Sequence, residues 1–464
     1  MTLPDRERAL VRGAWVLTMG PEGSVRDGAV LVSGGRIDRV GTYDQLVAEY
    51  EDVEVVGDGT GIVTPGLINA HTHLSEALIP GMGSEMTLFE WGREIVTPVS
   101  EHLTQEMAAE GTVLRSAEML HSGVTYVNDM FVHSNSGSRA SLGVVDGLAR
   151  VGLRGCVSFG AENALDGVTA MEPLTLDEIM FEHEALAAAA EGEELVDFRL
   201  GIGTLLGQSD KLLELGVDAC KRHGWVVHTH LAEDREEIVH SSLRWGRRTI
   251  AHAASIGLLD VPVVAGHVIW VTEDDVAMLS RAQVAVAYNP VANMILGSGV
   301  CPVPRLRSAG LPVGIGTDGA ASNDSQNMLE AVKAAPLLQK ISAVDPSVMS
   351  AEDALTMATI EGARALGIDA AVGSLEPGKA ADLVLFGGTA ELAAIHDPFQ
   401  QLVYCSSPRS VSNVWVDGRR LVSEGSLTSI DEGAQIATAR ALARDLAEVA
   451  GLCDRGYSQI CTTP

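Results

Sequence analysis

The sequence predicts an α/β protein in which a (β/α)8 barrel is joined to a small β domain formed from both termini. Eight apolar, strand-like runs alternate with helix-like segments through the middle of the chain, and eight such units are what this barrel requires. Short strand-like segments separated by turns occur at both ends of the chain. A length of 464 residues suits one large domain with a smaller satellite.

The first and last parts of the chain contain short strand-like runs separated by turns, as in a small β domain. We expect a β-sandwich built from residues 1–61 and 370–430, followed by a C-terminal helix and tail over residues 431–464. Turn signals at Gly34-Gly35 and Asp417-Gly418 separate neighbouring strands. The expected strands are Ala9 to Thr18, Ala29 to Val32, Arg36 to Val40, Val53 to Val56, Asp382 to Phe386, Ser410 to Val416 and Arg420 to Val422.

The barrel is expected over residues 62–369. Its predicted strands are the runs 62–68, 123–131, 154–160, 196–204, 225–232, 262–266, 283–289 and 311–317. Its predicted helices include Thr104 to His121, Leu176 to Ala190, Lys211 to His223, Arg235 to Ile256, Glu273 to Ser280 and Ala351 to Leu366, the last capped by Ser350 with Asp353 near N3. Functional groups of such barrels lie at the C-terminal ends of the strands, so polar residues at those ends are the candidates.

Two histidines, His71 and His73, follow the first run. Side chains two apart on a strand point to the same face, so these imidazoles form half of a metal site. The alternative is a pair of surface histidines. The apolar run Ile62 to Ile68 disfavours it, because burying two imidazoles without partners is costly.

Three further strand ends carry imidazoles or carboxylates. His228 and His230 share a face at the end of the fifth run, His267 ends the sixth, and Asp318 follows the eighth. Three histidines and a carboxylate suit zinc or iron(II). Glu233, just past the fifth run, can shuttle protons beside a metal site. The alternatives are a helix N-terminal acid for Glu233 and a buried core histidine for His267.

Together these residues resemble the amidohydrolase superfamily. The matching set is His71-Thr-His73, His230 with Glu233, His267, and Thr317-Asp318-Gly319-Ala320-Ala321-Ser322-Asn323, with Gly373 to Val384 in the small domain. More narrowly, it is similar to the aminohydrolases that include S-adenosylhomocysteine/methylthioadenosine deaminases and triazine (atrazine-type) hydrolases. The resemblance covers nearly the whole chain and implies that the barrel is distorted.

The resemblance implies one divalent metal, zinc first and iron(II) as the alternative. By position, His71, His73, His230 and Asp318 match the ligands. Glu233 matches the acid that protonates a ring nitrogen, His267 matches the residue that orients the attacking water, and Asp318 takes a proton from that water. His228 matches no ligand. A two-metal member would carry a lysine after the fourth strand, and the run 196–204 ends without one.

Candidate substrate residues are less specific. Trp91 matches an aromatic position of the nucleoside deaminases, His133 follows the second run, and Asn293 follows the seventh. Arg154 opens the third run, at the wrong end for a barrel active site. The alternatives are a loop histidine for His133, a surface ion pair for Arg154 and a turn residue for Asn293.

The expected activity is hydrolytic deamination of an aminated N-heterocycle such as a purine, adenosine derivative, pterin or triazine. The family's ribose-binding glutamate and substrate histidine match no such residue here, at Ser100 and at Gly203 to Gly207. One alternative is a dechlorinase or cyclic-amide hydrolase that uses the same site. A second is a non-catalytic ligand-binding protein on this scaffold.

Composition limits the partners. A formal net charge of −30 argues against nucleic acid and against anionic membrane surfaces. No apolar run reaches the roughly 18 residues of a membrane helix, and the first residues lack the apolar core of a signal peptide. The six cysteines form no Cys-x-x-Cys pair, so zinc-ribbon and dithiol redox motifs are absent. We expect a cytoplasmic homo-oligomer that binds a small N-heterocycle.

Overall fold

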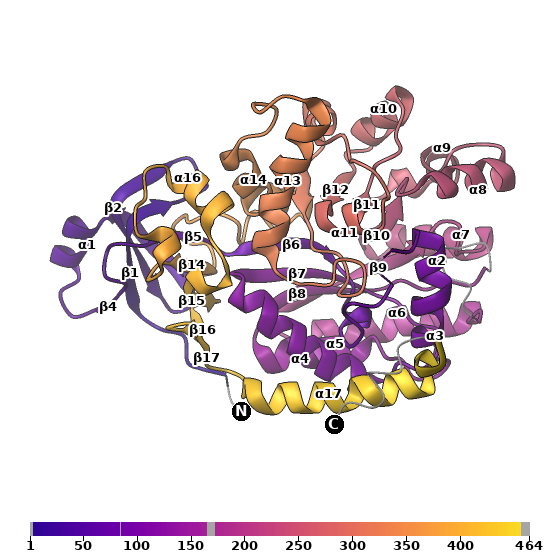
Figure 1. Ribbon diagram of the computed structural model, residues 1–464, viewed down its shortest axis with the longest axis horizontal. Coiled ribbons are helices and arrows are strands. Elements are labelled where there is room, and N and C mark those ends of the chain that lie inside the picture. Colours follow the sequence, from indigo (N-terminus) through magenta and orange to yellow (C-terminus); the bar gives the residue numbers. More distant parts are fainter. Residues whose placement is uncertain (1–2, 84, 165–171, 456–464) are drawn as a thin grey trace.

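An eight-stranded parallel barrel forms the centre of the molecule (Figure 1). The computed structural model describes residues 3–83, 85–164 and 172–455. Its barrel strands pair in chain order from β6 to β13, as the alternating runs predict. They are β6 (Leu67–Thr72), β7 (Val124–Phe131), β8 (Arg154–Phe159), β9 (Val196–Thr204), β10 (Val227–Leu231), β11 (Val263–His267), β12 (Ala285–Tyr288) and β13 (Val313–Ile315).

The barrel is nearly closed between its first and last strands. The Asp318 N–H, just after β13, donates to the carbonyl of His71 in β6 at 2.9 Å. Asn69 adds two side-chain bonds across the same seam, accepting from the Thr317 N–H at 3.0 Å and donating to the Thr317 hydroxyl at 2.7 Å. The seam therefore fixes the His71 strand end against the Asp318 strand end.

Both termini contribute to a second, mixed sheet, which confirms the predicted β domain. Its path is β17-β16-β15-β14-β5-β1-β2-β3, with β4 pairing to β1, so the strands form one continuous sheet. Its core includes Val11, Val30 and Trp415. The strands are β1 (Ala9–Leu17), β2 (Ser24–Ser33), β3 (Arg36–Thr42), β4 (Glu54–Val56), β5 (Ile62–Pro65), β14 (Leu383–Phe386), β15 (Val411–Val416), β16 (Arg419–Ser423) and β17 (Ser426–Leu427).

The first apolar run is divided between the two sheets. Ile62–Pro65 pairs with β1 and β14 in the mixed sheet, whereas Leu67–Thr72 enters the barrel. Gly66 lies between them, where a Cβ would stand 1.9 Å from the Thr125 hydroxyl. Hydrophobicity runs unbroken through this crossing, so the sequence alone does not reveal it. The predicted domain limits stay a prediction.

The helices pack outside the barrel. Those that match the predicted helices are α4 (Gln105–His121), α6 (Leu176–Glu191), α7 (Asp210–His223) and α10 (Glu273–Arg281). The others around the barrel are α2 (Leu88–Trp91), α3 (Thr97–Ser100), α5 (Leu142–Val151), α8 (Arg235–Trp245), α9 (Thr249–Ser255), α11 (Pro290–Ile295), α12 (Val303–Ser308), α13 (Met328–Ala343), α14 (Ala351–Met357) and α15 (Ile360–Ala365). Helices α1 (Tyr43–Glu49) and α16 (Pro398–Gln400) accompany the mixed sheet.

Two predicted helices are each divided in the structure. The segment 235–256 breaks at Gly246, whose left-handed backbone (φ 65°) caps α8. The segment 351–366 keeps the predicted Ser350–Asp353 capping box but breaks at Thr359. That break leaves the Ala358 carbonyl to accept from the Ile68 N–H at 2.8 Å. The Ala358 carbonyl therefore bonds to barrel strand β6 instead of to a later N–H group of the same helix.

The C-terminal helix α17 (Glu432–Val449) lies along the barrel beside α4 (Figure 1). Gln435 on α17 donates to the Glu110 carbonyl of α4 at 2.9 Å. The predicted tail beyond residue 455 lies outside the described residues. Within the described part of the chain, no helix is long and apolar enough to cross a membrane.

Candidate metal centre and active site

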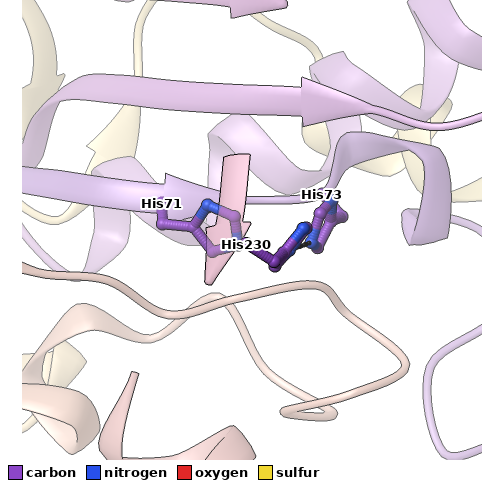
Figure 2. A group of neighbouring side chains, drawn as sticks. All are labelled: His71, His73 and His230. Carbon is purple, nitrogen blue, oxygen red and sulfur yellow. Dashed lines mark hydrogen bonds between the residues drawn. The ribbon is translucent and has the colours of Figure 1, made fainter. Parts of the chain in front are cut away.

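Three predicted histidines converge at the C-terminal ends of β6 and β10. His71, His73 and His230 are buried, and Figure 2 shows their rings gathered together. The His71 ring centroid lies 4.7 Å from that of His73 and 4.9 Å from that of His230. One nitrogen from each of the three lies within 4.8 Å of the others. This is the spacing of ligands around a single ion.

Backbone carbonyls fix the tautomers of two of these rings. His73 Nδ1 donates to the Met130 carbonyl at 2.7 Å, and His230 Nδ1 donates to the Gly203 carbonyl at 2.5 Å. Burial is the largest cause that lowers the pKa of His73, to about 4, and it also lowers the pKa of His230 well below its usual value. Both rings are therefore neutral near pH 7 and present bare Nε2 lone pairs.

A relay of side chains fixes the third ring. The Ser158 hydroxyl donates to the Asp129 carbonyl at 2.7 Å, so its oxygen accepts from His228 Nδ1 at 3.1 Å. His228 Nε2 must then accept, and it accepts from His71 Nδ1 at 2.8 Å. The chain of donors leaves the His71 Nε2 lone pair free. His228 therefore orients a candidate ligand instead of serving as one.

The exposed lone pairs test whether a metal fits. His73 Nε2 and His230 Nε2 face each other at 3.1 Å without a proton between them. His71 Nε2 is buried and has no hydrogen-bond partner among the described residues. Buried acceptors that face one another in this way are costly unless a cation lies between them. Neutral imidazoles of this kind are zinc and iron(II) ligands, so the residues fit the expected ion.

Asp318 completes the candidate ligand set. Its Oδ1 lies 3.4 Å from His71 Nε2 and 3.3 Å from His73 Nε2. Burial opposes its charge, but His71, His267 and His73 together hold the pKa of Asp318 well below its usual value. Its backbone is left-handed (φ 69°), which costs a non-glycine residue conformational energy. This backbone conformation directs the Asp318 carboxylate toward His71 and His73.

Glu233 and His267 stand next to this cluster. His267 Nε2 lies 3.5 Å from Glu233 Oε2 and 3.7 Å from Asp318 Oδ2. Asn293 Nδ2 lies 2.7 Å from His267 Nδ1, and Asn289 Nδ2 lies 3.4 Å from His267 Nε2. The shorter contact makes Nδ1 the acceptor, so the ring proton is on Nε2, facing both acids. The backbone of His267 is also left-handed (φ 70°). Asn293 therefore positions His267, instead of lining the pocket.

Glu233 has the properties of a proton donor. Burial first, and then the charge of Asp318, raise the pKa of Glu233 well above its usual value. Its N–H donates to Glu237 Oε2 at 2.7 Å, and the preceding Ala232 N–H donates to Glu237 Oε1 at 2.9 Å. Two bonds from one carboxyl group hold the turn that carries Glu233. This side chain is therefore a fixed acid that keeps its proton to a higher pH than an ordinary glutamate.

A pocket opens onto the cluster. Trp91 contributes an aromatic wall and is held by its indole N–H, which donates to the Ala321 carbonyl at 3.1 Å. The lining residues are His73, Ser75, Glu76, Leu88, Trp91, Val96, Val132, Glu162, Gly203, Thr204, His230 and Glu233. An apolar wall with convergent polar groups is the usual form of a small-molecule site.

Two predicted substrate residues lie elsewhere. His133 is buried against α6, where its Nε2 lies 2.7 Å from Glu182 Oε1 and its ring stacks on Phe159. Arg154 lies at the N-terminal end of β8 and pairs with Asp382 of the mixed sheet at 2.9 Å. Both candidates are corrected by the structure. The His133 side chain points to the Glu182 carboxylate of α6. Arg154 links the barrel to the mixed sheet.

Two pocket acids escaped the sequence interpretation. Glu76 lies three residues after His73, in a short 3-10 turn, and Glu162 lies two residues past the third run. Glu76 Oε2 accepts from the Ala321 and Ser322 N–H groups at 2.8 and 3.1 Å. A Cβ on Gly319 would lie 1.9 Å from the same oxygen. The rule that polar residues after a strand end are candidates would have found Glu162.

Comparisons of sequence find relatives that are named as deaminases. The chain is 33% identical to a 5'-deoxyadenosine deaminase of Methanopyrus kandleri, with 90% of this chain and 94% of that protein covered. It is 35% identical to a 5-methylthioadenosine/S-adenosylhomocysteine deaminase of Pelotomaculum thermopropionicum, with 91% and 95% covered.

Solved structures share the fold. An adenosine deaminase from Xanthomonas campestris with bound zinc superposes with a TM-score of 0.87 at 28% identity, covering 96% of this chain and all of that one. A triazine hydrolase from Arthrobacter aurescens gives a TM-score of 0.86 at 23% identity, with 94% and 99% covered, which shows a shared fold. The model of the amidohydrolase family matches residues 62–421. The chain belongs to the amidohydrolase family.

Proposed function

We propose that this protein is a metal-dependent hydrolytic deaminase of an aminated N-heterocycle. The observation that carries the proposal is the clustering of three histidines and Asp318 beside Glu233, with His73, His230 and Glu233 lining one pocket. His71, His73, His230 and Asp318 would hold one divalent ion, and Glu233 stands beside it. The full-length similarity to proteins named as deaminases supports cleavage of the bond between a ring carbon and its amino nitrogen.

The metal would be zinc, with iron(II) as the alternative. The donor set suits either, and the zinc bound by the similar adenosine deaminase favours zinc. Such an ion supplies Lewis acidity and water of lowered pKa near neutral pH. The three histidine nitrogens lie within 4.8 Å of one another, and Asp318 lies 3.3–3.4 Å from two of them, which supports one ion instead of two.

The remaining residues would carry the proton transfers. Asp318 is held ionised, so it accepts a proton from the attacking water. His267 donates from Nε2 and orients that water, because Asn293 fixes its tautomer. Glu233, whose pKa is raised, gives a proton to a ring nitrogen, which makes the amine-bearing carbon more electrophilic. Trp91 offers its face to the heterocycle.

Ammonia release by the zinc-loaded protein tests the proposal. The panel is adenosine, 5'-methylthioadenosine, adenine, guanine, isocytosine, aminopterins and melamine. We expect release from at least one member, loss after chelation and recovery on adding zinc. Glu233→Gln should bind the same substrate but turn it over about 10²- to 10⁴-fold more slowly.

The same assay distinguishes the alternatives. Chloride from a chlorotriazine or ring opening of a lactam, without ammonia from any panel member, would replace deamination by another hydrolysis. Binding without turnover by wild type would leave a non-catalytic protein. The expected homo-oligomer and cytoplasmic location stay predictions.

A further inference from the structure

Glu76 lines the pocket, but no step of the proposed chemistry uses it. It is 4% exposed and lies three residues after His73, at the end of a short 3-10 turn. Its Oε2 accepts from the N–H groups of Ala321 and Ser322 at 2.8 and 3.1 Å, and no described residue donates to its Oε1. One oxygen therefore ties the turn after the first barrel strand to the loop after the eighth.

The turn that carries Glu76 is fixed on its other side by α4. Arg115 of α4 donates from Nε to the Ala77 carbonyl at 2.8 Å. A Cβ on Gly111 of the same helix would lie 2.8 Å from the Ala77 Cβ, so α4 packs closely on the turn. Glu76 therefore projects from a base that the helix holds in place, and it meets the loop after β13 from a fixed position.

The loop reaches the Asp318 carboxylate through Gly319. The Gly319 N–H lies 3.0 Å from both Asp318 Oδ1 and Ser322 Oγ, so it donates to the two oxygens together. The Ser322 hydroxyl has two acceptors in turn, Glu76 Oε2 at 3.2 Å and the Gly319 carbonyl at 3.3 Å. A Cβ on Gly319 would lie 1.9 Å from Glu76 Oε2, so the loop closes on Glu76 without a side chain between them. The position of Ser322 therefore affects the N–H that orients Asp318.

The Asp318 main chain has separate supports. Its N–H donates to the His71 carbonyl at 2.9 Å, and its carbonyl accepts from Gln326 Nε2 at 2.7 Å. Loss of the Glu76 contacts should therefore change the direction of the Asp318 carboxylate and leave the strand end in place. Because the three histidines are not part of this loop, the candidate metal site should keep its ion.

The same loop also holds the aromatic wall of the pocket. The Ala321 carbonyl accepts from the Trp91 indole at 3.1 Å, while the Ala321 N–H donates to Glu76. Glu76 thus fixes the residue that holds the Trp91 ring. Two groups of the proposed chemistry, the Asp318 carboxylate and the Trp91 ring, are linked in this way to one buried side chain.

We infer that Glu76 is a positioning residue that acts through the loop over residues 319–322. By holding this loop, it keeps the Asp318 carboxylate directed at the histidines and the Trp91 ring directed at the pocket. The inference rests on the proposed function and adds a residue to it. The role requires one acceptor oxygen, because both N–H groups meet the same atom. Burial first, and then the charge of Asp318, raise the pKa of Glu76 to about 8, so this group holds a proton more readily than an ordinary glutamate. An uncharged amide can therefore replace it, whereas an apolar side chain cannot.

Two substitutions of similar length test the inference. Glu76→Gln keeps one acceptor oxygen, whereas Glu76→Met keeps none. We expect zinc-loaded Glu76→Gln to stay within about threefold of the wild-type kcat/KM for the panel substrate. Glu76→Met should keep one zinc per chain, lose about 10- to 100-fold in kcat and gain about threefold in KM, because Asp318 and Trp91 are misplaced.

Two further variants separate the two links. Ser322→Ala removes the loop hydroxyl but keeps both N–H bonds to Glu76, so kcat should fall about threefold with KM unchanged. Trp91→Phe removes the indole N–H and keeps an aromatic ring, and its increase in KM should not add to that of Glu76→Met. Glu184→Met, at an exposed acid of α6, is the matched control, with no expected change. A melting curve for each variant checks that the barrel is folded.

Crystal structures of zinc-loaded wild type, Glu76→Gln and Glu76→Met give a measurement that does not depend on turnover. We expect the Asp318 carboxylate and the Trp91 ring to shift in Glu76→Met only. Unmoved groups in Glu76→Met, or a loss of kcat in Glu76→Gln as large as in Glu76→Met, overturn the inference. Should Glu76→Met fail to fold, a wild-type kcat in Ser322→Ala overturns it. If the two groups shift as expected while wild type releases no ammonia, the inference stands and the proposed function fails.

Discussion

Two buried histidine–carboxylate clusters lie in this barrel, and they differ in where their protons are. At the strand ends, His71, His73 and His230 direct bare lone pairs at one point beside Asp318. Near α6, His133 Nε2 meets Glu182 Oε1 at 2.7 Å with a proton between them. The first cluster directs several nitrogen lone pairs at one point, whereas in the second an imidazole N–H is paired directly with a carboxylate.

The carboxylates of the two clusters, Glu182 and Asp318, also differ in the groups that surround them. Burial raises the pKa of Glu182, but the hydrogen bond and charge of His133 and the Ser141 hydroxyl outweigh it and lower that pKa. Asp318 has no such donor at normal hydrogen-bond distance from these histidines, its nearest being 3.3 Å away. Residue type and burial are alike in both places. The orientation of the nitrogens distinguishes a metal site from a structural pair.

Removing a ligand should give the largest effect. His73→Ala and His230→Ala each delete one of the facing nitrogens, so the zinc content should fall far below one ion per chain. Turnover of the panel substrate should drop about 10³-fold, because the water is no longer activated. Metal analysis of the purified protein and steady-state kinetics measure both.

The α6 cluster supplies the control for that experiment. His133→Ala should keep one zinc per chain, although it also removes a buried histidine. A zinc loss equal to that of His73→Ala would show that the two clusters do not differ as described.

Breaking the α6 pair should instead destabilise the fold. Glu182→Gln removes the buried carboxylate that accepts from His133 Nε2 and from the Ser141 hydroxyl, so the free energy of unfolding should fall by about 2 kcal/mol. Zinc stoichiometry and kcat should stay near those of wild type. Denaturant unfolding of the zinc-loaded protein measures the change. A large loss of kcat at normal stability would place this pair in the active site after all.

His228 should have an intermediate effect, through the tautomer of His71. His228→Phe removes the acceptor for His71 Nδ1, so His71 is free to place its proton on the wrong nitrogen. Zinc affinity should fall about 10- to 100-fold, measured by competition with a chelator. Ser158→Ala breaks the relay one link earlier and should weaken zinc binding less. Unchanged affinity in His228→Phe would contradict the relay.

Whether a site residue could be predicted from the sequence depends on what determines the direction of its side chain. Apolar runs fix a strand and its end, and parallel strands bring their ends together, so His71, His230, His267 and Asp318 could be assembled from sequence. The division of the first run at Gly66 could not, because both halves are buried. Arg154 was a misleading candidate because its partner Asp382 lies 228 residues away.

The remaining misses have a similar origin. The side chain of His133 follows a loop, where no periodicity says whether it turns to the pocket or to α6. Glu76 lies in a 3-10 turn and owes its place to backbone N–H groups at Ala321 and Ser322. Contacts of this kind depend on tertiary closure between the first and eighth strands. Sequence patterns report local geometry, and these positions are set by distant segments.

The smallest effect concerns His183, which neighbours the α6 pair and packs at an angle against the rings of Phe159 and Phe198. Burial lowers the pKa of His183 to about 4, against a partial opposing effect of Glu182. Between pH 6.5 and 4 the unfolded chain therefore binds a proton that the folded chain does not. Stability contributed by this group is complete above pH 6.5 and declines as the pH falls through that window.

His183→Phe should remove at most one proton from the pH dependence of unfolding. The slope of unfolding free energy between pH 4 and 6.5 should become shallower by up to about 1.4 kcal/mol per pH unit, with no change in slope above pH 7. Denaturant titrations of the metal-free protein at half-unit steps measure it. His396→Gln, at an exposed histidine, is the matched control. An identical slope in His183→Phe would mean that this imidazole takes up its proton inside the fold, and that the Glu182 carboxylate stabilises two histidines instead of one.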